Sequence, residues 1–201
     1  MRICKMFFIG FLSFCTTFSY AQKDKTFDFY ASLDLNAGNY YGFDFALNTI
    51  LVEKISIKVG LSNNVREPKD IPDDFGLFYK GIGMITPNYN PKEFQQSYEF
   101  LLGRVFEFKN IKSVRILVHI GIGDVKLTKP TNYKKLEYPP DVGHQYSFSY
   151  YSFKSVHFIF NPRIEFPFTN FYGLSISPIL KIGNNSNFYG IGIGHIFGKI
   201  R

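Results

Sequence analysis

The feature that most constrains this chain is a two-residue rhythm of large apolar side chains, clearest close to the C-terminus. The stretch YGIGIGHIFG, residues 189–198, places Tyr189, Ile191, Ile193 and Phe197 on one side of an extended backbone. The glycines between them occupy the other side. Because strand side chains point alternately to opposite faces, this pattern predicts a β-strand with one bulky apolar face and one nearly bare face.

The same rhythm recurs in seven earlier segments. One face carries mainly Phe, Ile, Leu and Val, and the other carries charged residues, Ser, Asn or Gly. Strict alternation over such lengths indicates strands, so the chain is not a helical bundle. The eight segments cover residues 27–38, 41–48, 55–62, 97–108, 114–123, 155–166, 173–182 and 189–198.

The N-terminus has the layout of an export signal. Two basic residues precede an apolar run at residues 6–18, and small residues follow at positions suited to cleavage before Gln22. The run is shorter than the roughly 20 apolar residues that a membrane-spanning helix needs. We therefore predict that residues 1–21 are a cleaved signal peptide and that residues 22–201 form one domain.

Cleavage at that point leaves a domain without cysteine. Cys4 and Cys15 both lie in the predicted signal, so the domain has neither disulfides nor a thiolate metal site. A lipoprotein signal ending at Cys15 is an alternative, but Phe14 stands where its peptidase prefers a small residue. The net charge of +7 is spread along the chain, and we predict no binding to nucleic acid.

The connectors between the eight segments differ in length in a regular way. Only those at residues 65–95 and 125–149 are long, and an up-and-down arrangement places both at the same end. Transmembrane barrels have short turns at one end and longer loops at the other. A sheet in lipid must also close on itself to pair its backbone groups. The predicted fold is an all-β, eight-stranded antiparallel up-and-down transmembrane barrel with a filled polar lumen, with a water-soluble secreted barrel or sandwich as the alternative.

On these segments the sequence resembles small outer-membrane β-barrel proteins of Gram-negative bacteria, of the outer membrane protein beta-barrel domain or PorT-like type. The last strand carries the resemblance best, because its apolar residues alternate up to the aromatic Phe197; His195 and the extension GKIR depart from the pattern. The resemblance implies a place in the cell outer membrane, among lipid and lipopolysaccharide. It also implies insertion by the barrel assembly machinery with periplasmic chaperones, but no activity.

Charges of both signs lie on the predicted inner faces. Eight strands enclose a lumen only wide enough to be filled by side chains, and buried charges persist only when they are paired. We therefore predict a self-neutralising lumen charge network, with a proton or ion path as the alternative. Its members are Asp28, Asp34, Asp44, Lys58, Glu99, Arg115, Arg163, Glu165 and Lys181, with Glu107, His119 and His157 on the same faces.

Three residues fit the barrel pattern badly. Arg104 falls on the lipid-facing side of its strand, where it is costly, and a bulge at Gly103 that turned it inward would remove the cost. Pro162 and Pro178 lie inside strands that have no free edge. We predict a bulge or a locally opened ladder at each proline.

Few residues suggest chemistry. A membrane acyl hydrolase needs a nucleophile beside an oriented base, and only Ser155 and His157 are adjacent in the pattern, in reverse of the order found in barrel lipid A deacylases and pointing inward. The aspartates at 70, 73 and 74 lack the spacing of a calcium loop. No glycine-rich phosphate motif precedes a helix. We predict no catalytic residue, metal site or small-molecule cofactor.

The two long connectors remain as functional surface. Four lysines in the second connector are candidate lipopolysaccharide contacts: Lys126, Lys129, Lys134 and Lys135. An ordinary solvated loop is the alternative. We expect a non-enzymatic surface protein with a structural or adhesive role through these external loops. A lipid A or phospholipid acyl hydrolase and a narrow porin-like channel are the alternatives.

Overall fold

The computed structural model describes residues 27–51, 54–73, 75, 91–108, 111–137, 146–184 and 186–200. The predicted signal peptide lies outside the described residues. Within these ranges, no helix is long and apolar enough to cross a membrane.

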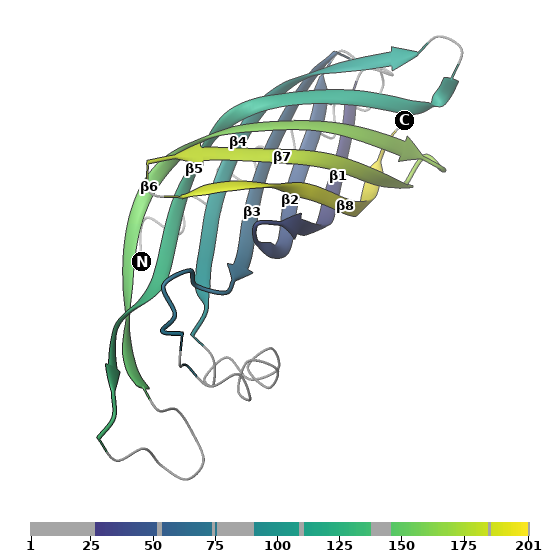
Figure 1. Ribbon diagram of the computed structural model, residues 1–201. Coiled ribbons are helices and arrows are strands. Elements are labelled where there is room, and N and C mark those ends of the chain that lie inside the picture. Colours follow the sequence, from purple (N-terminus) through teal and green to yellow (C-terminus); the bar gives the residue numbers. More distant parts are fainter. Residues whose placement is uncertain are drawn as a thin grey trace, which may run out of the picture.

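Eight antiparallel strands form one sheet, and β8 pairs with β1 to close it into a barrel (Figure 1). This confirms the predicted fold class. The strands are β1 Phe27–Gly38, β2 Tyr41–Leu51, β3 Ile55–Arg66, β4 Glu93–Phe108, β5 Ile111–Lys135, β6 Tyr146–Pro167, β7 Tyr172–Gly183 and β8 Asn187–Lys199.

The strands are strongly tilted. Followed from partner to partner around the ring, the register that starts at Asp28 returns to β1 at Gly38, ten residues further along. A shear of that size with eight strands corresponds to a tilt of about 40°. The two ends are unlike. We call the end of the barrel where β1 begins, β8 ends and the β2–β3, β4–β5 and β6–β7 pairs are joined the short-turn end, and the opposite end the loop end.

The two faces of the barrel are as the alternation predicts. On β1, Leu35 is 69% exposed on the outside while the adjacent Asp34 is 1% exposed on the inside. Apolar side chains are exposed on the outer face of every strand, for example Phe43, Val59, Phe100, Ile122, Phe158, Ile176 and Ile193. The closed sheet therefore has an apolar exterior, and its interior holds the buried charged and polar side chains together with buried apolar clusters.

The two prolines share one gap in the sheet. Pairing between β6 and β7 stops after Phe160 and resumes at Ile164 with the register unchanged, so Pro162 and Pro178 stand opposite each other in the gap. The Asn161 side chain donates a hydrogen bond to the Pro178 carbonyl at 3.0 Å. The predicted local opening of the ladder is confirmed, and pairing the prolines confines their missing N–H groups to one place.

The bulge at Gly103 that would have turned Arg104 inward is not present. The β4–β5 register runs unbroken past Gly103 and shifts only between Glu107 and Phe108. Arg104 therefore stays on the outer face, but it pairs with Ile55 at the very start of β3, beside the short-turn end. From there a long side chain reaches the membrane surface, so no inward turn is needed.

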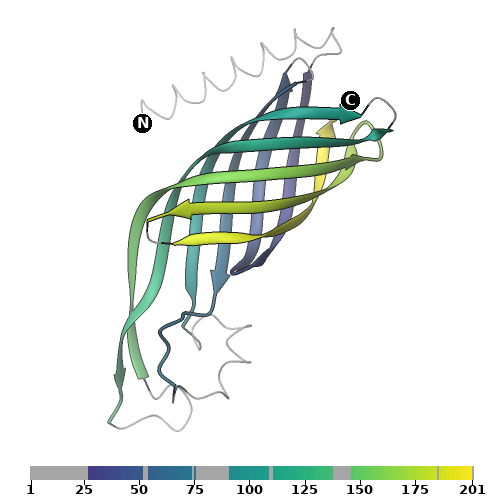
Figure 2. The ribbon, with the colours of Figure 1, turned by 45° about the horizontal axis from the view of Figure 1, so that its top comes forward.

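The largest difference from the sequence prediction is at the loop end. Alternation predicts a connector over residues 125–149, but β5 continues to Lys135 and β6 begins at Tyr146. Residues 124–135 of β5 and 146–156 of β6 form an arm that extends past the ends of β7 and β8 (Figures 1 and 2). Strand β4 pairs with the arm as far as Thr128, and beyond that point the arm is two-stranded among the described residues. At about 3.3 Å per residue the arm is roughly 35 Å long.

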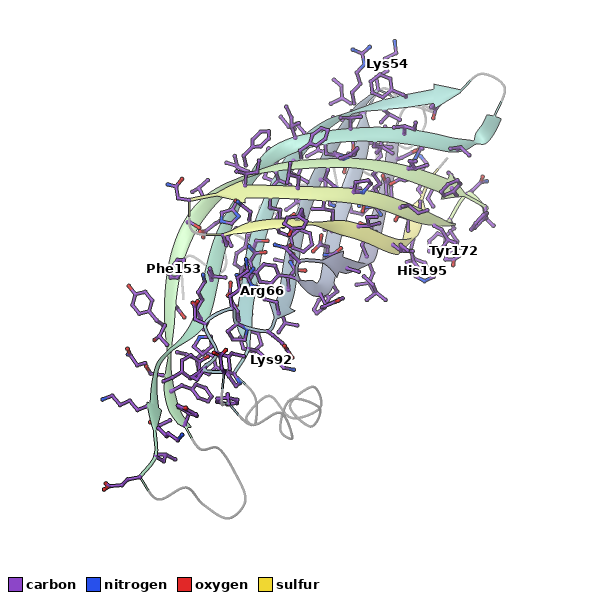
Figure 3. All side chains as sticks on the ribbon, viewed as in Figure 1. Lys54, Arg66, Lys92, Phe153, Tyr172 and His195 are labelled. Carbon is purple, nitrogen blue, oxygen red and sulfur yellow. The ribbon has the colours of Figure 1, made fainter. Side chains whose placement is uncertain are left out.

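The short-turn end explains the unusual histidine in the last strand. His195 stacks on Tyr172 of β7, with ring centroids 5.9 Å apart, and its Nδ1 lies 2.9 Å from the Tyr172 hydroxyl. Both lie on the barrel exterior next to Phe197 (Figure 3). His195 thus belongs to an aromatic cluster of the kind found at membrane interfaces.

Candidate functional site

The lumen near the short-turn end is organised around Arg115 on β5. Its Nε donates to Glu165 of β6 and its Nη1 donates to Asp28 of β1, each at 2.7 Å. Tyr30 donates its hydroxyl to the second Glu165 oxygen at 2.8 Å. One buried cation is thus shared by two carboxylates from strands distant in the sequence.

The middle of the lumen is organised around Arg163 on β6. Its two terminal nitrogens donate to the two carboxylate oxygens of Asp34 on β1, at 3.0 and 3.2 Å. Ser175 accepts a further hydrogen bond at 2.7 Å, and Nε lies 3.1 Å from Glu165. Bidentate pairs of this kind fix geometry as well as charge.

Toward the loop end the network centres on Lys181 of β7. Its Nζ donates to Glu99 of β4 at 2.6 Å and to the Ser62 hydroxyl at 2.8 Å, and it lies 3.8 Å from Asp44. Asn36 completes the group by donating to Asp44 at 2.7 Å. This third cluster spans β1, β2, β3, β4 and β7.

The structure brings eight of the nine predicted lumen charges into ion pairs. Lys58 is the exception: it donates to Asn161 at 3.0 Å and, among the described residues, has no carboxylate within ion-pair distance. His119 lies deeper in the lumen against Ser56, at 2.9 Å. Glu107 belongs to the same face of β4 but is exposed at the short-turn end.

The glycines of β8 make room for this network. A Cβ added to Gly194 would clash with the carboxylate of Asp34, and one added to Gly192 would lie 2.9 Å from the Asn36 amide oxygen. The bare face of the last strand thus allows the polar side chains of β1 to lie flat against the backbone of β8. Buried apolar clusters share the lumen with this network, one around Leu117 and Ile196 and one around Phe188.

A pocket of about 1110 Å³ lies at the loop end of the barrel. It is bounded by the β1–β2 and β7–β8 turns, by the segment after β3 and by β5. Four cations line it, Arg66, Lys69, Lys92 and Lys129, against one acid, Glu67. Figure 3 shows Arg66 and Lys92 at this end, and Lys54 at the opposite end.

Two of the pocket's cations contact the buried carboxylate of Glu93. It accepts a hydrogen bond from Arg66 Nη2 at 2.7 Å and from the Tyr40 hydroxyl, and Lys129 Nζ lies 3.8 Å away. Burial, and then the bond to Glu93, raise the pKa of Tyr40, so the phenol remains a donor. Glu93 and Glu67 together offset only two of the four cations, so the pocket keeps a positive excess.

The four lysines predicted to contact lipopolysaccharide do not form one patch. Lys129 lines the pocket, whereas Lys126 lies on the opposite face of β5, directly across from Lys154 of β6. Lys134 and Lys135 are exposed near the far end of the arm. Sequence reasoning missed Arg66, Lys69 and Lys92, because nothing in the chain order shows that the first long connector meets β5.

Ser155 and His157 are adjacent on the inner face of β6, with Ser155 Oγ 3.0 Å from His157 Nε2. The His157 Nδ1 has no hydrogen-bond partner in the part of the chain that the structure describes. A Ser–His pair needs a third group to orient the imidazole. This pair therefore lacks the arrangement of an active hydrolase.

Comparison with known proteins supports the fold. No protein-family profile matches the sequence, and a search of curated proteins gives no match. Two solved structures are similar over 86–88% of this chain and 98% of their own: a major outer membrane protein from Thermus thermophilus, at 11% identity and a TM-score of 0.51, and Neisserial surface protein A, at 10% identity and a TM-score of 0.50.

The fold and its two faces define the class. Water cannot wet a continuous apolar exterior around a closed sheet at low cost, whereas hydrocarbon can. Apart from the gap around Pro162 and Pro178, the described strands pair their backbone groups within the closed sheet, as lipid requires. The chain has the fold of an outer-membrane β-barrel protein, and the resemblance noted in the sequence is confirmed at the level of the fold.

Proposed function

We propose that this protein is a non-enzymatic, non-conducting surface protein that binds an anionic saccharide at the loop end. The observation that carries the proposal is the positive excess of the pocket lined by Arg66, Lys69, Lys92 and Lys129. Barrels of this class hold their longer loops outside the cell, so the pocket faces the surroundings. The role is adhesive or ligand-contacting.

Two exposed tyrosines support a saccharide rather than a simple ion. Tyr41 of β2 and Tyr189 of β8 line the same pocket, and both are more than half exposed. Aromatic faces pack against the apolar faces of sugar rings, while the cations bind phosphate or sulfate groups. The phosphorylated sugars of lipopolysaccharide and soluble acidic polysaccharides share this chemistry.

Binding measurements on protein in neutral-lipid nanodiscs test the proposal, with lipopolysaccharide and a soluble sulfated oligosaccharide as separate probes. Replacing Lys69 and Lys92 together by glutamine removes two pocket cations. We expect about tenfold weaker binding, equivalent to roughly 1.4 kcal/mol. The matched control replaces Lys134 and Lys135 by glutamine, and equal loss in both variants would contradict the proposal.

Salt and the choice of probe give further information. Binding through exposed cations weakens as ionic strength rises. Binding of lipopolysaccharide alone points to the protein's own membrane as the source, and binding of the soluble probe points to an external polysaccharide. The barrel assembly machinery and periplasmic chaperones remain predicted partners during export.

The side chains in the lumen support the proposal that the protein does not conduct ions. Arg115, Arg163 and Lys181 each pair with a carboxylate, and each lies at a different level along the barrel. Planar-bilayer recordings of the purified protein are expected to show no stable conductance steps. For the enzymatic alternative, mass spectrometry of lipid A from strains lacking or overproducing the protein is the deciding measurement. A changed acyl count would replace our proposal by a hydrolase.

A further inference from the structure

Strand β6 continues well beyond its neighbour on one side. Its last pair with β7 is His157 with Gly183, where β7 ends, yet β6 begins at Tyr146. The preceding residues of β6 pair with β5 alone among the described strands. Figures 1 and 2 show the molecule from different directions, and in both β5 and β6 extend past the end of β7.

On the side away from β5, residues 149–156 have no strand partner among the described residues. The Ser149 carbonyl accepts a hydrogen bond from the Thr131 side chain of β5 at 3.3 Å, so Ser149 directs its backbone toward β5. Residues of opposite parity therefore direct theirs to the other side. These are Tyr150, Ser152, Lys154 and Val156, and no backbone hydrogen bond joins them to described residues on that side.

The two edges of the arm differ in their protection. The β5 edge, free of β4 after Thr128, carries Pro130 and a register shift between Thr131 and Lys134. Proline and irregular pairing are devices that prevent another strand from adding to an edge. The β6 edge has neither over residues 149–156, and Lys154 is its one charged residue.

The β6 edge is also held in place by aromatic contacts. The Phe148 ring packs edge-on against the Tyr150 ring, with 5.7 Å between the ring centroids. It is tilted against the ring of Tyr133 of β5, with 5.8 Å between the centroids. Phe94 of β4 meets Tyr150 from the barrel side at 6.4 Å. An edge that is already ordered loses less conformational freedom when a partner binds.

We propose that residues 149–156 of β6 are a docking site for an extended, acidic segment of another protein, which adds to the sheet as its next strand. Main-chain hydrogen bonds supply affinity in this mode of recognition. Acidic character follows from the charge of the arm. The arm and the nearby Glu137 together carry two acids, Asp124 and Glu137. They carry five cations: Lys126, Lys129, Lys134, Lys135 and Lys154.

A second copy of this chain in the same membrane does not fit the site. Copies in one membrane direct their arms the same way, so their β6 strands run parallel when brought side by side. A strand pair related by two-fold symmetry within a sheet is antiparallel. The geometry therefore favours a segment of a different protein.

The test uses the full-length protein in nanodiscs and two labelled ten-residue peptides, one alternating threonine with glutamate and one alternating threonine with lysine. Ser152→Pro removes an N–H from the free edge. Ser152→Ala is the matched control, because both variants lose the contact between the Ser152 and Thr128 hydroxyls at 2.8 Å but alanine keeps the N–H.

We expect the acidic peptide to bind wild type and Ser152→Ala equally, and Ser152→Pro about tenfold more weakly, as for one lost interaction of roughly 1.4 kcal/mol. The basic peptide is expected to bind at least about tenfold more weakly than the acidic one. Equal binding of both peptides, or of all three proteins, overturns the proposal.

Hydrogen exchange on the wild-type protein tests the site without any substitution. In the free protein the amides of Tyr150, Ser152 and Lys154 are expected to exchange fast, while those of Tyr151 and Phe153, bonded to β5, exchange slowly. Addition of the acidic peptide should slow the first set. Slow exchange of that set in the free protein, or no slowing by the peptide, overturns the proposal.

Discussion

Replacement of Arg163 by methionine removes the cation at the centre of the lumen. The side chain is fully buried, and its partners Asp34 and Glu165 are buried to the same degree. Glu165 keeps Arg115 and Tyr30 as donors, but Asp34 keeps only the Ser175 hydroxyl, at 2.9 Å. Among the described residues, Asp34 is then left in the interior with no cation within ion-pair distance.

Breaking a buried ion pair in this way costs about 3–5 kcal/mol. With a urea dependence of about 2 kcal/mol per molar, within the usual range, the unfolding midpoint should fall by roughly 2 M. The midpoint is measured in lipid vesicles by far-ultraviolet circular dichroism. Arg163→Lys keeps the charge but loses the bidentate geometry, so we expect an intermediate midpoint.

Arg104→Met makes the same chemical change on the outer face and serves as the control. A lipid-facing arginine near the interface costs up to about 1 kcal/mol, so its removal should leave the midpoint unchanged or raise it slightly. A double variant, Arg163→Met with Asp34→Leu, removes both charges and should recover most of the lost stability. An unchanged midpoint in Arg163→Met alone refutes the view that the lumen is dry and its charges depend on one another.

Three further predictions follow from other parts of the molecule. Gly194→Val should destabilise the barrel by about 1–3 kcal/mol in the same assay, because the new side chain displaces Asp34; a neutral effect argues against the close approach of β1 and β8. Outer-membrane fractions should contain the protein, and it should migrate differently on gels before and after boiling; absence of both counts against a barrel. Burial, with Tyr150 and Asp70 nearby, raises the pKa of Tyr133 to about 12. Because this pKa lies above the ordinary tyrosine value of about 10, folding favours the protonated form of Tyr133. The contribution of Tyr133 to folding stability is therefore complete below about pH 10 and is lost as the pH rises through about 12. Ultraviolet difference titration of wild type against Tyr133→Phe gives the midpoint, and a value near 10 contradicts the burial of this ring.

The barrel was predictable because lipid imposes a pattern on the sequence. Where a strand crosses the membrane, one face must be apolar and the other must fit a crowded lumen, so residues such as Leu35 and Asp34 alternate strictly. The prolines were predictable for a related reason: a closed sheet has no free edge, so Pro162 and Pro178 had to open a ladder somewhere.

The arm was not predictable from alternation, because neither face of a strand outside the membrane has to be apolar. Pro130 and the neighbouring lysines therefore looked like a loop. The signal that was present was composition: residues 146–153 are Tyr, Phe and Ser only, and aromatic residues favour strands. Pairing with β6 then holds β5 extended despite its proline.

The members of the lumen network were predictable, but their partners were not. Asp34 and Arg163 are 129 residues apart, and they meet because the shear of the barrel brings those levels of β1 and β6 together. Partner choice depends on the register of every strand between them. The loop-end pocket is harder still, because it joins two connectors whose positions no local pattern fixes.

The most direct test of the account uses the absence of tryptophan from the sequence. Two variants, Leu35→Trp on the apolar exterior and Tyr151→Trp on the arm, each contain a single tryptophan. In vesicles with brominated acyl chains, we expect strong quenching of Leu35→Trp and almost none of Tyr151→Trp, with aqueous iodide giving the reverse. Quenching of Leu35→Trp by iodide but not by brominated lipid would mean that water, not hydrocarbon, covers the outer face.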